Sequence, residues 1–335
     1  MLQKKIKIYD EIYIGASLAV LLKICTSNKK ILIVEKDKNF GGAWRNNYSH
    51  NLRNIDLACH LIVTQGKKHC NHIISYTKKL GVKLKVIEKK NLFYDSKNFK
   101  AYGKTGPALV CKTGWSDMLN KIQNIILKKK NITIVRNARV SKIEAKEKKI
   151  KINYGNKKVS LGKKIYFPVY CDLNHINFLD KKIHLPFNLI KNIHYVFFLK
   201  AKSNILNNEF QAFLEKNKNS IFDRLSISSS TYLKNKVNSY VVCARVSKNI
   251  KTKLHLINYK SILSFLMSNK LIDSGKVILL KRIKYICPYR NIDDVKKIKD
   301  LLKINKIPVE ILDTRYMGHF LWKIAKLHYK KNVIK

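Results

Sequence analysis

Apolar and polar residues follow two different periods along the chain, and these periods predict a mixed α/β protein. Residues 6–14 alternate and are rich in β-formers, Gly15 interrupts them, and residues 17–25 continue as an apolar helix. Residues 31–34 form a wholly apolar run that ends at Glu35, which is typical of a buried parallel strand. Together these segments predict a strand, a tight turn, a helix and a second strand, with a right-handed crossover.

The remaining segments predict further helices and several short strands. Apolar residues at helical spacing predict helices at residues 69–80, 115–127, 292–304 and 320–327. Strand-like runs stand at residues 82–87, 132–135, 140–144, 165–169, 195–200, 239–247 and 309–312, and a hairpin at 149–161 turns at Gly155-Asn156. The later strand-like runs alternate with polar linkers, which favours an antiparallel sheet in a second lobe.

Lysine dominates an unusually basic composition. The chain has 335 residues, with 69 Lys and Arg against 21 Asp and Glu, and its formal net charge is +48. Only nine of the basic residues are Arg, whereas proteins that read nucleic-acid sequence use the planar Arg guanidinium for bidentate contacts. We therefore expect a solvated Lys-rich surface and no specific nucleic-acid partner, while nonspecific, salt-sensitive binding of polyanions stays open.

Composition also bounds the fold and the compartment. Hydrophobic residues make up 46% of the chain, enough to fill a core and to exclude wholesale disorder. Seven Cys without a C-x-x-C pair favour a reducing compartment over a disulfide framework or a zinc ribbon. The longest apolar run, residues 12–22, has 11 residues, fewer than the roughly 18 that a membrane helix needs. Asp10 and Glu11 interrupt the only stretch that resembles a secretion signal, so we expect a cytoplasmic protein without a membrane span.

The first turn carries the pattern of a dinucleotide site. Such a site needs a turn where backbone approaches a pyrophosphate, a helix N-terminus that faces this anion, and an acidic residue about 20 positions later for the ribose hydroxyls. The interval from Gly15 to Glu35 supplies this order. Ser17 and Val20 occupy the second and third glycine positions of G-x-G-x-x-G. Ser17 fits if its hydroxyl caps the helix or contacts the phosphate, whereas Val20 demands a helix set slightly farther from the sheet.

A glycine pair after the acidic strand makes the pattern more specific. The segment Phe40-Gly41-Gly42-Ala43-Trp44-Arg45 follows soon after Glu35 and Lys36. Here the chain resembles the flavoproteins of the glutathione reductase-like FAD fold, in particular the branch of amine oxidases, protoporphyrinogen oxidases and UDP-galactopyranose mutases. The resemblance implies that FAD is the cofactor, that Glu35 holds its adenosine ribose, and that the glycine pair passes its ribityl and isoalloxazine end.

Later segments resemble the same branch in the same order. Residues 112–119 resemble the entry to its long helix, and residues 132–143 resemble the strand whose backbone meets the adenine. Residues 286–290 and 309–320 resemble its return to the FAD domain, although Thr314 stands where the family usually has Gly before Arg. The cofactor-binding residues that the resemblance implies are Gly15, Ala16, Ser17, Leu18, Glu35, Lys36, Gly41, Gly42, Trp44, Arg45, Val140 and Arg315.

The resemblance also implies a domain organisation. A Rossmann-like FAD-binding domain with a parallel sheet, built from residues 1–50, 110–175 and 285–335, is interleaved with an antiparallel-sheet substrate domain of residues 51–109 and 176–284. Only five Pro and no Pro- or Gly-rich linker separate the segments. We therefore expect lobes woven together in sequence, as the length of the chain also favours.

Three residues are candidates for catalysis. His60 falls where the mutase-like members carry a His beside the flavin, and a structural histidine is the alternative. Tyr289 and Arg290 would line the substrate cavity, and an ordinary sheet aromatic and a surface cation are the alternatives. No metal is expected, because the group of Cys59, His60, His69, Cys70 and His72 matches no common zinc spacing and adjacent strand residues point to opposite faces.

Four functional hypotheses follow. The first is an FAD-dependent oxidoreductase whose flavin accepts a hydride equivalent from an organic small molecule held between the two lobes. The second is a degenerate, non-catalytic member of the same fold that acts as a binding protein. The third is a flavin-dependent nucleotide-sugar mutase, and the fourth is a nonspecific nucleic-acid binder. The sequence predicts no particular oligomeric state.

Overall fold

The structure is a computed structural model in which the chain forms two compact units. It describes residues 6–44, 46–49, 52–56, 60–88, 90–95, 98–101, 107–146, 149–168, 175–179, 181–185, 189–200, 210–215, 224–229, 239–246, 259–268, 278–290, 292–312 and 317–333. The first unit comprises Met1–Gly42, Asn120–Ile190 and Pro288–Leu321, and the second comprises Ala43–Leu119, Lys191–Cys287 and Trp322–Lys335.

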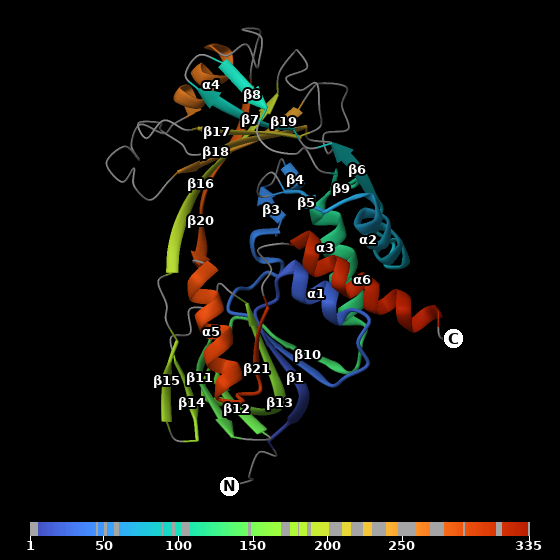
Figure 1. Cartoon of the computed structure of the whole chain (residues 1–335), viewed down its shortest axis with the longest axis vertical. Helices are drawn as coiled ribbons and strands as arrows, with labels where there is room; N and C mark the ends of the chain where they lie inside the picture. Colours follow the sequence, from blue (N-terminus) through green and yellow to red (C-terminus); the bar gives the residue numbers. More distant parts are fainter. Residues whose placement is uncertain are drawn as a thin grey trace. The chain divides into compact units, whose positions relative to one another are not determined.

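A nine-stranded sheet forms the first unit (Figure 1), in the order β10-β2-β1-β13-β12-β11-β14-β15 with β21 also paired to β13. The strands are β1 Ile8–Ile14, β2 Ile31–Val34, β10 Ile132–Val135, β11 Val140–Lys146, β12 Lys149–Tyr154, β13 Lys158–Pro168, β14 His175–Phe178, β15 Lys181–His184 and β21 Val309–Leu312. The pairs β1·β2, β2·β10, β1·β13 and β13·β21 are parallel, and β12 joins β11 and β13 as an antiparallel meander. The expected strand, turn, helix and strand at the start are present, with α1 at Leu18–Ile24.

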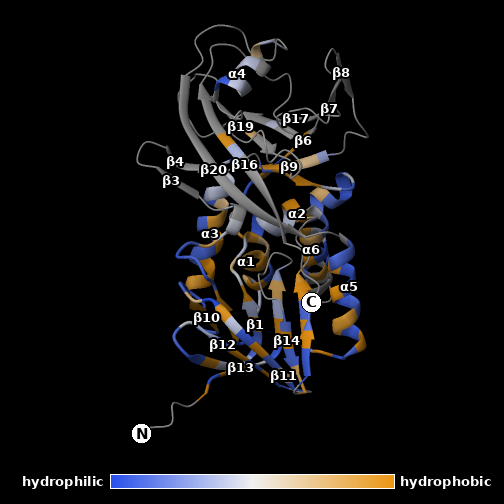
Figure 2. Cartoon of the chain, turned by 90° about the vertical axis from the view of Figure 1, so that its left-hand side faces the viewer, coloured by the Kyte–Doolittle hydropathy of each residue, from blue (hydrophilic) through white to orange (hydrophobic). Residues whose placement is uncertain are grey.

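The strands in the middle of this sheet have one apolar and one polar face. Ile12 of β1, Ile165 of β13 and Ile311 of β21 are buried in the main core together with Val295 and Ile298 of α5, whose bounds are Ile292–Ile304. Polar or aromatic residues flank these isoleucines in the sequence. They are Glu11 and Tyr13 beside Ile12, Lys164 and Tyr166 beside Ile165, and Glu310 before Ile311. Figure 2 shows the matching division of α5 into an apolar and a polar side. Burial of one face therefore fixes the register of these strands.

One sequence-based expectation is wrong at β13. The sequence predicted a hairpin strand that ends at Leu161 and a separate run from Ile165, whereas the structure has one continuous strand, Lys158–Pro168. Its first residues pair with β12, its middle pairs with β1, and its end pairs with β21. The strand is continuous because each part of β13 pairs with at least one neighbouring strand.

The second unit contains a separate seven-stranded sheet of order β20-β16-β19-β18-β17-β7-β8. Its strands are β7 Lys90–Asp95, β8 Asn98–Ala101, β16 Leu189–Lys200, β17 Phe210–Glu215, β18 Arg224–Ser229, β19 Ser239–Val246 and β20 Ile278–Arg290. The pairs β16·β19, β18·β19, β17·β18 and β7·β8 are antiparallel, and β17·β7 is parallel. The predicted fold class, a parallel-dominated α/β sheet with a separate and mostly antiparallel sheet, is confirmed.

Smaller elements complete the chain. Two minor sheets contain β3 Asn46–Ser49 with β4 Leu52–Asp56, and β5 Ile62–Val63 with β9 Pro107–Cys111 and β6 Leu84–Glu88. The remaining helices are η1 Gly42–Trp44, α2 Lys67–Lys79, α3 Trp115–Leu127, α4 Tyr259–Ser268 and α6 Met317–Val333. Among the described residues, no helix is long and apolar enough to cross a membrane.

Candidate functional site

The turn after β1 has the geometry that a glycine favours. Gly15 has a φ of 87°, in the left-handed region, and its N–H donates to the Val34 carbonyl at 2.8 Å. Ser17 is the N-cap of α1, and its hydroxyl accepts a hydrogen bond from the Val20 N–H at 3.4 Å. The hydroxyl of Ser17 therefore caps the helix, which is one of the two ways in which the sequence predicted that Ser17 would fit.

Glu35 faces this turn from the end of β2. The residue is only 7% exposed. Its Oε2 accepts a hydrogen bond from the Ala16 N–H at 2.7 Å, and its Oε1 accepts one from the Asp37 N–H at 2.9 Å. Because a carboxylate has about four acceptor sites, these two bonds leave capacity for hydroxyl donors. The role of Glu35 at a ribose stays a prediction.

The same contacts narrow the list of backbone donors in the turn. The N–H of Gly15 donates to Val34 and the N–H of Ala16 donates to Glu35. These two amides shape the turn and hold the carboxylate, so they are not free to bind an anion. Contact of the Ser17 and Leu18 backbone with a diphosphate stays a prediction.

The glycine pair lies against the turn. Gly41 and Gly42 have φ values of 101° and 58°, and the Gly41 N–H donates to the Ala16 carbonyl at 2.8 Å. Ser17 and Gly41 form a parallel β-bridge, and a Cβ added at Gly42 would lie 3.9 Å from the Ser17 Cβ. The two glycine segments that the sequence singled out are therefore neighbours within the first unit.

A third segment binds the backbone of Glu35 and lies within residues 132–143, the stretch that resembles the adenine-contacting strand. The Glu35 N–H donates to the Val135 carbonyl at 2.8 Å, and the Glu35 carbonyl accepts the Ala138 N–H at 3.0 Å. Asn137 between them has a φ of 51°, a conformation that Asn tolerates better than most residues. Val140 follows this loop as the first residue of β11, where the β11·β12 register is irregular.

In the second unit, Trp44 and His60 form an aromatic cluster with Trp115. The rings of Trp44 and His60 stack at 4.4 Å between centroids, and Trp115 meets Trp44 edge-on at 4.8 Å. The Trp115 Nε1–H donates to the His60 carbonyl at 2.8 Å, and Trp115 is buried. These contacts hold His60 within an aromatic cluster. Its role in catalysis stays a prediction.

The Cys and His residues at which no metal was expected contact other side chains. The His69 ring stacks on Trp322 at 4.3 Å, and Cys70 Sγ lies 3.0 Å from Thr64 Oγ1. Within the part of the chain that the structure describes, no three His, Cys, Asp or Glu side chains gather closely enough to hold a metal ion. Cys59 lies outside the described residues.

Several candidate residues lie where side chains are not described. Arg45, Thr314 and Arg315 are outside the described residues. Tyr289 and Arg290 are the last two residues of β20, and only their backbone is described. Lys36 is exposed beside Glu35. These roles stay predictions.

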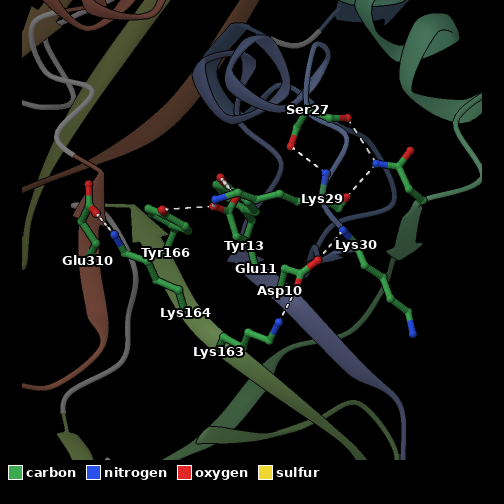
Figure 3. A network of polar contacts seen from close by, with 11 residues as sticks. Asp10, Glu11, Tyr13, Ser27, Lys29, Lys30, Lys163, Lys164, Tyr166 and Glu310 are labelled. Atoms are coloured by element: carbon green, nitrogen blue, oxygen red, sulfur yellow. Dashed lines mark hydrogen bonds and ion pairs between the residues drawn. The ribbon is translucent and has the colours of Figure 1, made fainter. Parts of the chain in front are cut away.

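A network of polar contacts surrounds Glu11 on the polar face of β1 and β13 (Figure 3), and the sequence analysis did not predict it. Glu11 accepts hydrogen bonds from Lys29 Nζ at 2.6 Å and from the Tyr13 hydroxyl at 2.7 Å. The Tyr166 hydroxyl donates to the same carboxylate at 3.4 Å, and the Tyr13 and Tyr166 rings stack at 4.6 Å between centroids. The signal was present in the alternation of β1 and β13, which places polar residues on one face.

Burial and pairing shift the pKa values in this network. Burial alone would raise the pKa of Glu11, but the hydrogen bonds from Lys29 and Tyr13 outweigh it, and the net pKa is lowered. Burial is also the main cause that raises the pKa of Tyr166 to about 12. Lys23 Nζ lies 3.8 Å from the centre of the Tyr166 ring. The burial of Lys23 lowers the pKa of its ammonium group. The network therefore keeps Glu11 ionised and Tyr166 neutral near pH 7.

The two sheets and the interleaved order of the units define the fold of amine and protoporphyrinogen oxidases. Cyclohexylamine oxidase from Brevibacterium oxydans is similar with a TM-score of 0.68 and 12% identity, over 96% of this chain and 99% of that chain. A protein from Exiguobacterium assigned as a protoporphyrinogen oxidase has a TM-score of 0.65 and 8% identity, over 98% and 99% of the two chains. The resemblance to this branch is confirmed at the level of the fold.

The same fold also includes a protein of another kind. Rab GDI from Plasmodium falciparum is similar with a TM-score of 0.54 and 10% identity, over 93% of this chain and 95% of that chain. No protein-family model matches the chain, and no curated protein matches its sequence. The likeness to these structures therefore shows the fold alone.

Proposed function

We propose that the protein is an FAD-dependent oxidoreductase that acts on an organic small molecule. The observation that carries the proposal is the Glu35 carboxylate, held at the end of β2 by the amides of Ala16 and Asp37 and turned toward the glycine turn. The fold shared with cyclohexylamine oxidase supports a redox role over other uses of a dinucleotide turn.

The residues of the turn fit FAD in three respects. Glu35 would accept hydrogen bonds from the hydroxyls of the adenosine ribose through its remaining lone pairs. Gly15, Gly41 and Gly42 would let the backbone approach the cofactor without a side chain in between. The Ser17 hydroxyl accepts a hydrogen bond from the Val20 N–H and so caps α1. In this position it would not obstruct the approach of the cofactor to the backbone. When bound, FAD would supply the redox chemistry, and these residues would hold and orient it.

Flavin binding is the first experiment. The purified protein, with and without added FAD, should show the visible absorption bands of oxidised flavin. Glu35→Gln should weaken FAD binding by roughly 10- to 100-fold, because it removes charge-assisted hydrogen bonds worth about 1.5–3 kcal/mol. Glu144→Gln, which changes a carboxylate on β11 in the same way, is the matched control and should leave FAD affinity unchanged.

Three outcomes decide the proposal. Failure of the wild type to take up FAD would refute it. Equal FAD affinity in Glu35→Gln and wild type would remove Glu35 from the site. If flavin binds, its anaerobic bleaching by a panel of primary amines and porphyrinogens tests turnover, and a panel that leaves the flavin oxidised would argue against these two substrate classes.

A non-catalytic binding protein of the same fold is the second candidate. Two observations favour it: the likeness to Rab GDI, and the Ser17 and Val20 side chains where the fingerprint has glycine. This alternative predicts that Ser17→Gly combined with Val20→Gly fails to confer FAD binding. Clear flavin uptake by the wild type would dismiss it.

A further inference from the structure

Two histidines face each other on the hairpin at one edge of the nine-stranded sheet. In the antiparallel pair β14·β15, His175 stands directly opposite His184. Their ring centroids are 6.4 Å apart. On its other side β14 pairs with β11, and β15 ends the strand order of the sheet. The two imidazoles are thus brought together by register, from positions nine residues apart.

The histidine pair lies on the outer face of this hairpin. Ile176 and Ile183, which are also opposite each other, face the main core; Ile176 is completely buried and Ile183 packs against the same core. Since side chains alternate along a strand, His175 and His184 point to the other face. His184 is exposed and His175 is partly exposed, so a solute can reach the pair.

Charged side chains surround the histidine pair. Lys182 and Lys142 lie close enough to His175 to interact with it electrostatically. On the neighbouring strand, Glu144 pairs with both Lys142 and Lys151. The carboxylate offsets part of the positive charge that a metal ion would meet.

We propose that His175 and His184 together bind one divalent transition-metal ion, with water completing its coordination. Imidazole suits Cu²⁺, Ni²⁺ and Zn²⁺, and the general order of affinity places Cu²⁺ above the other two. Metal-to-nitrogen distances of about 2.0–2.1 Å would require both rings to turn a nitrogen toward a point between them, and the exposed His184 leaves room for such a rotation. The ion would tie β15 to β14 and so stabilise the edge of the sheet. This site is independent of the proposed flavin chemistry.

Titration of the metal-free, full-length protein tests the site. CuCl₂ followed by electron paramagnetic resonance should reveal one tight site with two nitrogen ligands, and calorimetry should give weaker binding of ZnCl₂. His175→Ala and His184→Ala should each weaken Cu²⁺ binding at least tenfold, since even changes around metal ligands typically cost 10- to 100-fold. His319→Ala, at an exposed histidine of α6 in the same unit, should leave the tight site intact.

A second variant changes the affinity in the opposite direction. Lys182→Gln removes a cation that repels the metal and should tighten Cu²⁺ binding modestly, most clearly at low salt. If an alanine variant fails to fold, His175→Gln and His184→Gln replace it, because an amide keeps a polar side chain but lacks the imidazole. No Cu²⁺ binding by the wild type up to about 1 mM, or a tight site that survives both histidine variants, would overturn the proposal.

Discussion

At the residue scale, Glu11 shows how a charged side chain can be stable while it is buried against a sheet. Its side chain is 8% exposed, whereas that of its partner Lys29 is 60% exposed. A buried carboxylate is costly unless its lone pairs are satisfied, and here Lys29, Tyr13 and Tyr166 supply the donors. The stability of this region should therefore depend on the charge of Glu11 far more than on that of an exposed carboxylate.

Glu11→Gln should lower the free energy of unfolding by about 1–3 kcal/mol, because the amide keeps the shape but loses the charge-assisted bonds and presents a donor to Lys29 or Tyr13. Urea denaturation at pH 7 measures the loss. Glu144→Gln, at a more exposed ion pair, should cost only about 0–1 kcal/mol. Equal losses in the two variants would contradict the special role of Glu11.

The pH dependence of the same difference has a definite sign. The folded pKa of Glu11 is lowered, so between the folded and unfolded pKa values the unfolded state binds more protons. Its contribution is fully present above the unfolded value of about 4.3 and is lost as pH falls through the folded pKa. The gap between wild type and Glu11→Gln in urea midpoint should therefore be constant near neutrality and shrink as pH falls below about 4. A gap that widens in acid would reverse the assignment.

At the scale of elements, β13 organises the first unit because it pairs with three other strands. Gly162 lies where β13 meets β1, opposite Tyr9 and near Ile12. A Cβ added to Gly162 would come within 2.7 Å of Ile12 Cδ1 and 2.8 Å of Ile12 Cγ1. The approach of the two strands therefore depends on the missing side chain.

Gly162→Ala should destabilise the protein by about 1–3 kcal/mol through overpacking of the core. Combining it with Ile12→Val, which removes the closest methyl group, should recover part of the loss. Gly66→Ala is the control, since its Cβ would meet nothing within 4 Å and its φ of 162° is extended backbone. Chemical denaturation compares the four proteins, and a neutral Gly162→Ala would contradict the close approach.

Periodicity predicted several elements to the residue. The strands at 31–34, 132–135 and 309–312 and the helices at 115–127 and 292–304 have the expected ends. Their apolar residues lie on a buried face, and local pattern records burial directly. The helix expected at 320–327 extends over Met317–Val333, because its flanking turns lack the apolar spacing that the prediction relied on.

The residues of the candidate site could be named from the sequence, and their roles stay predictions, whereas the contacts between them could not be predicted. Spacing singled out Gly15, Glu35 and the glycine pair. The bond from Ala16 to Glu35 depends on the β1·β2 register, which sets Gly15 N–H against Val34. The loop at Asn137 joins the site through backbone bonds that carry no side-chain signal. Such contacts follow from tertiary pairing, so a single sequence does not reveal them.

At the scale of the whole molecule, charge opposes compaction. A net charge of +48 creates self-repulsion that destabilises the compact state, while it favours solubility and contact with polyanions. The Glu11–Lys29 and Glu144–Lys151 pairs relieve this repulsion only locally. The balance between repulsion and the apolar core should therefore be sensitive to ionic strength.

Salt should stabilise the protein. Raising NaCl from about 0.05 M to about 0.5 M shortens the Debye length from about 14 Å to about 4 Å, which screens repulsion between lysines that are not in contact. For units of this size, a change of about 1 kcal/mol in the free energy of unfolding shifts the melting temperature by roughly 2–4 °C. The melting temperature measured by scanning calorimetry should therefore rise by several degrees. KCl at equal ionic strength should give the same rise, because screening does not depend on which cation is used. A melting temperature that stays level or falls over this range would mean that the short-range ion pairs, and not the overall repulsion, dominate the electrostatics of the fold.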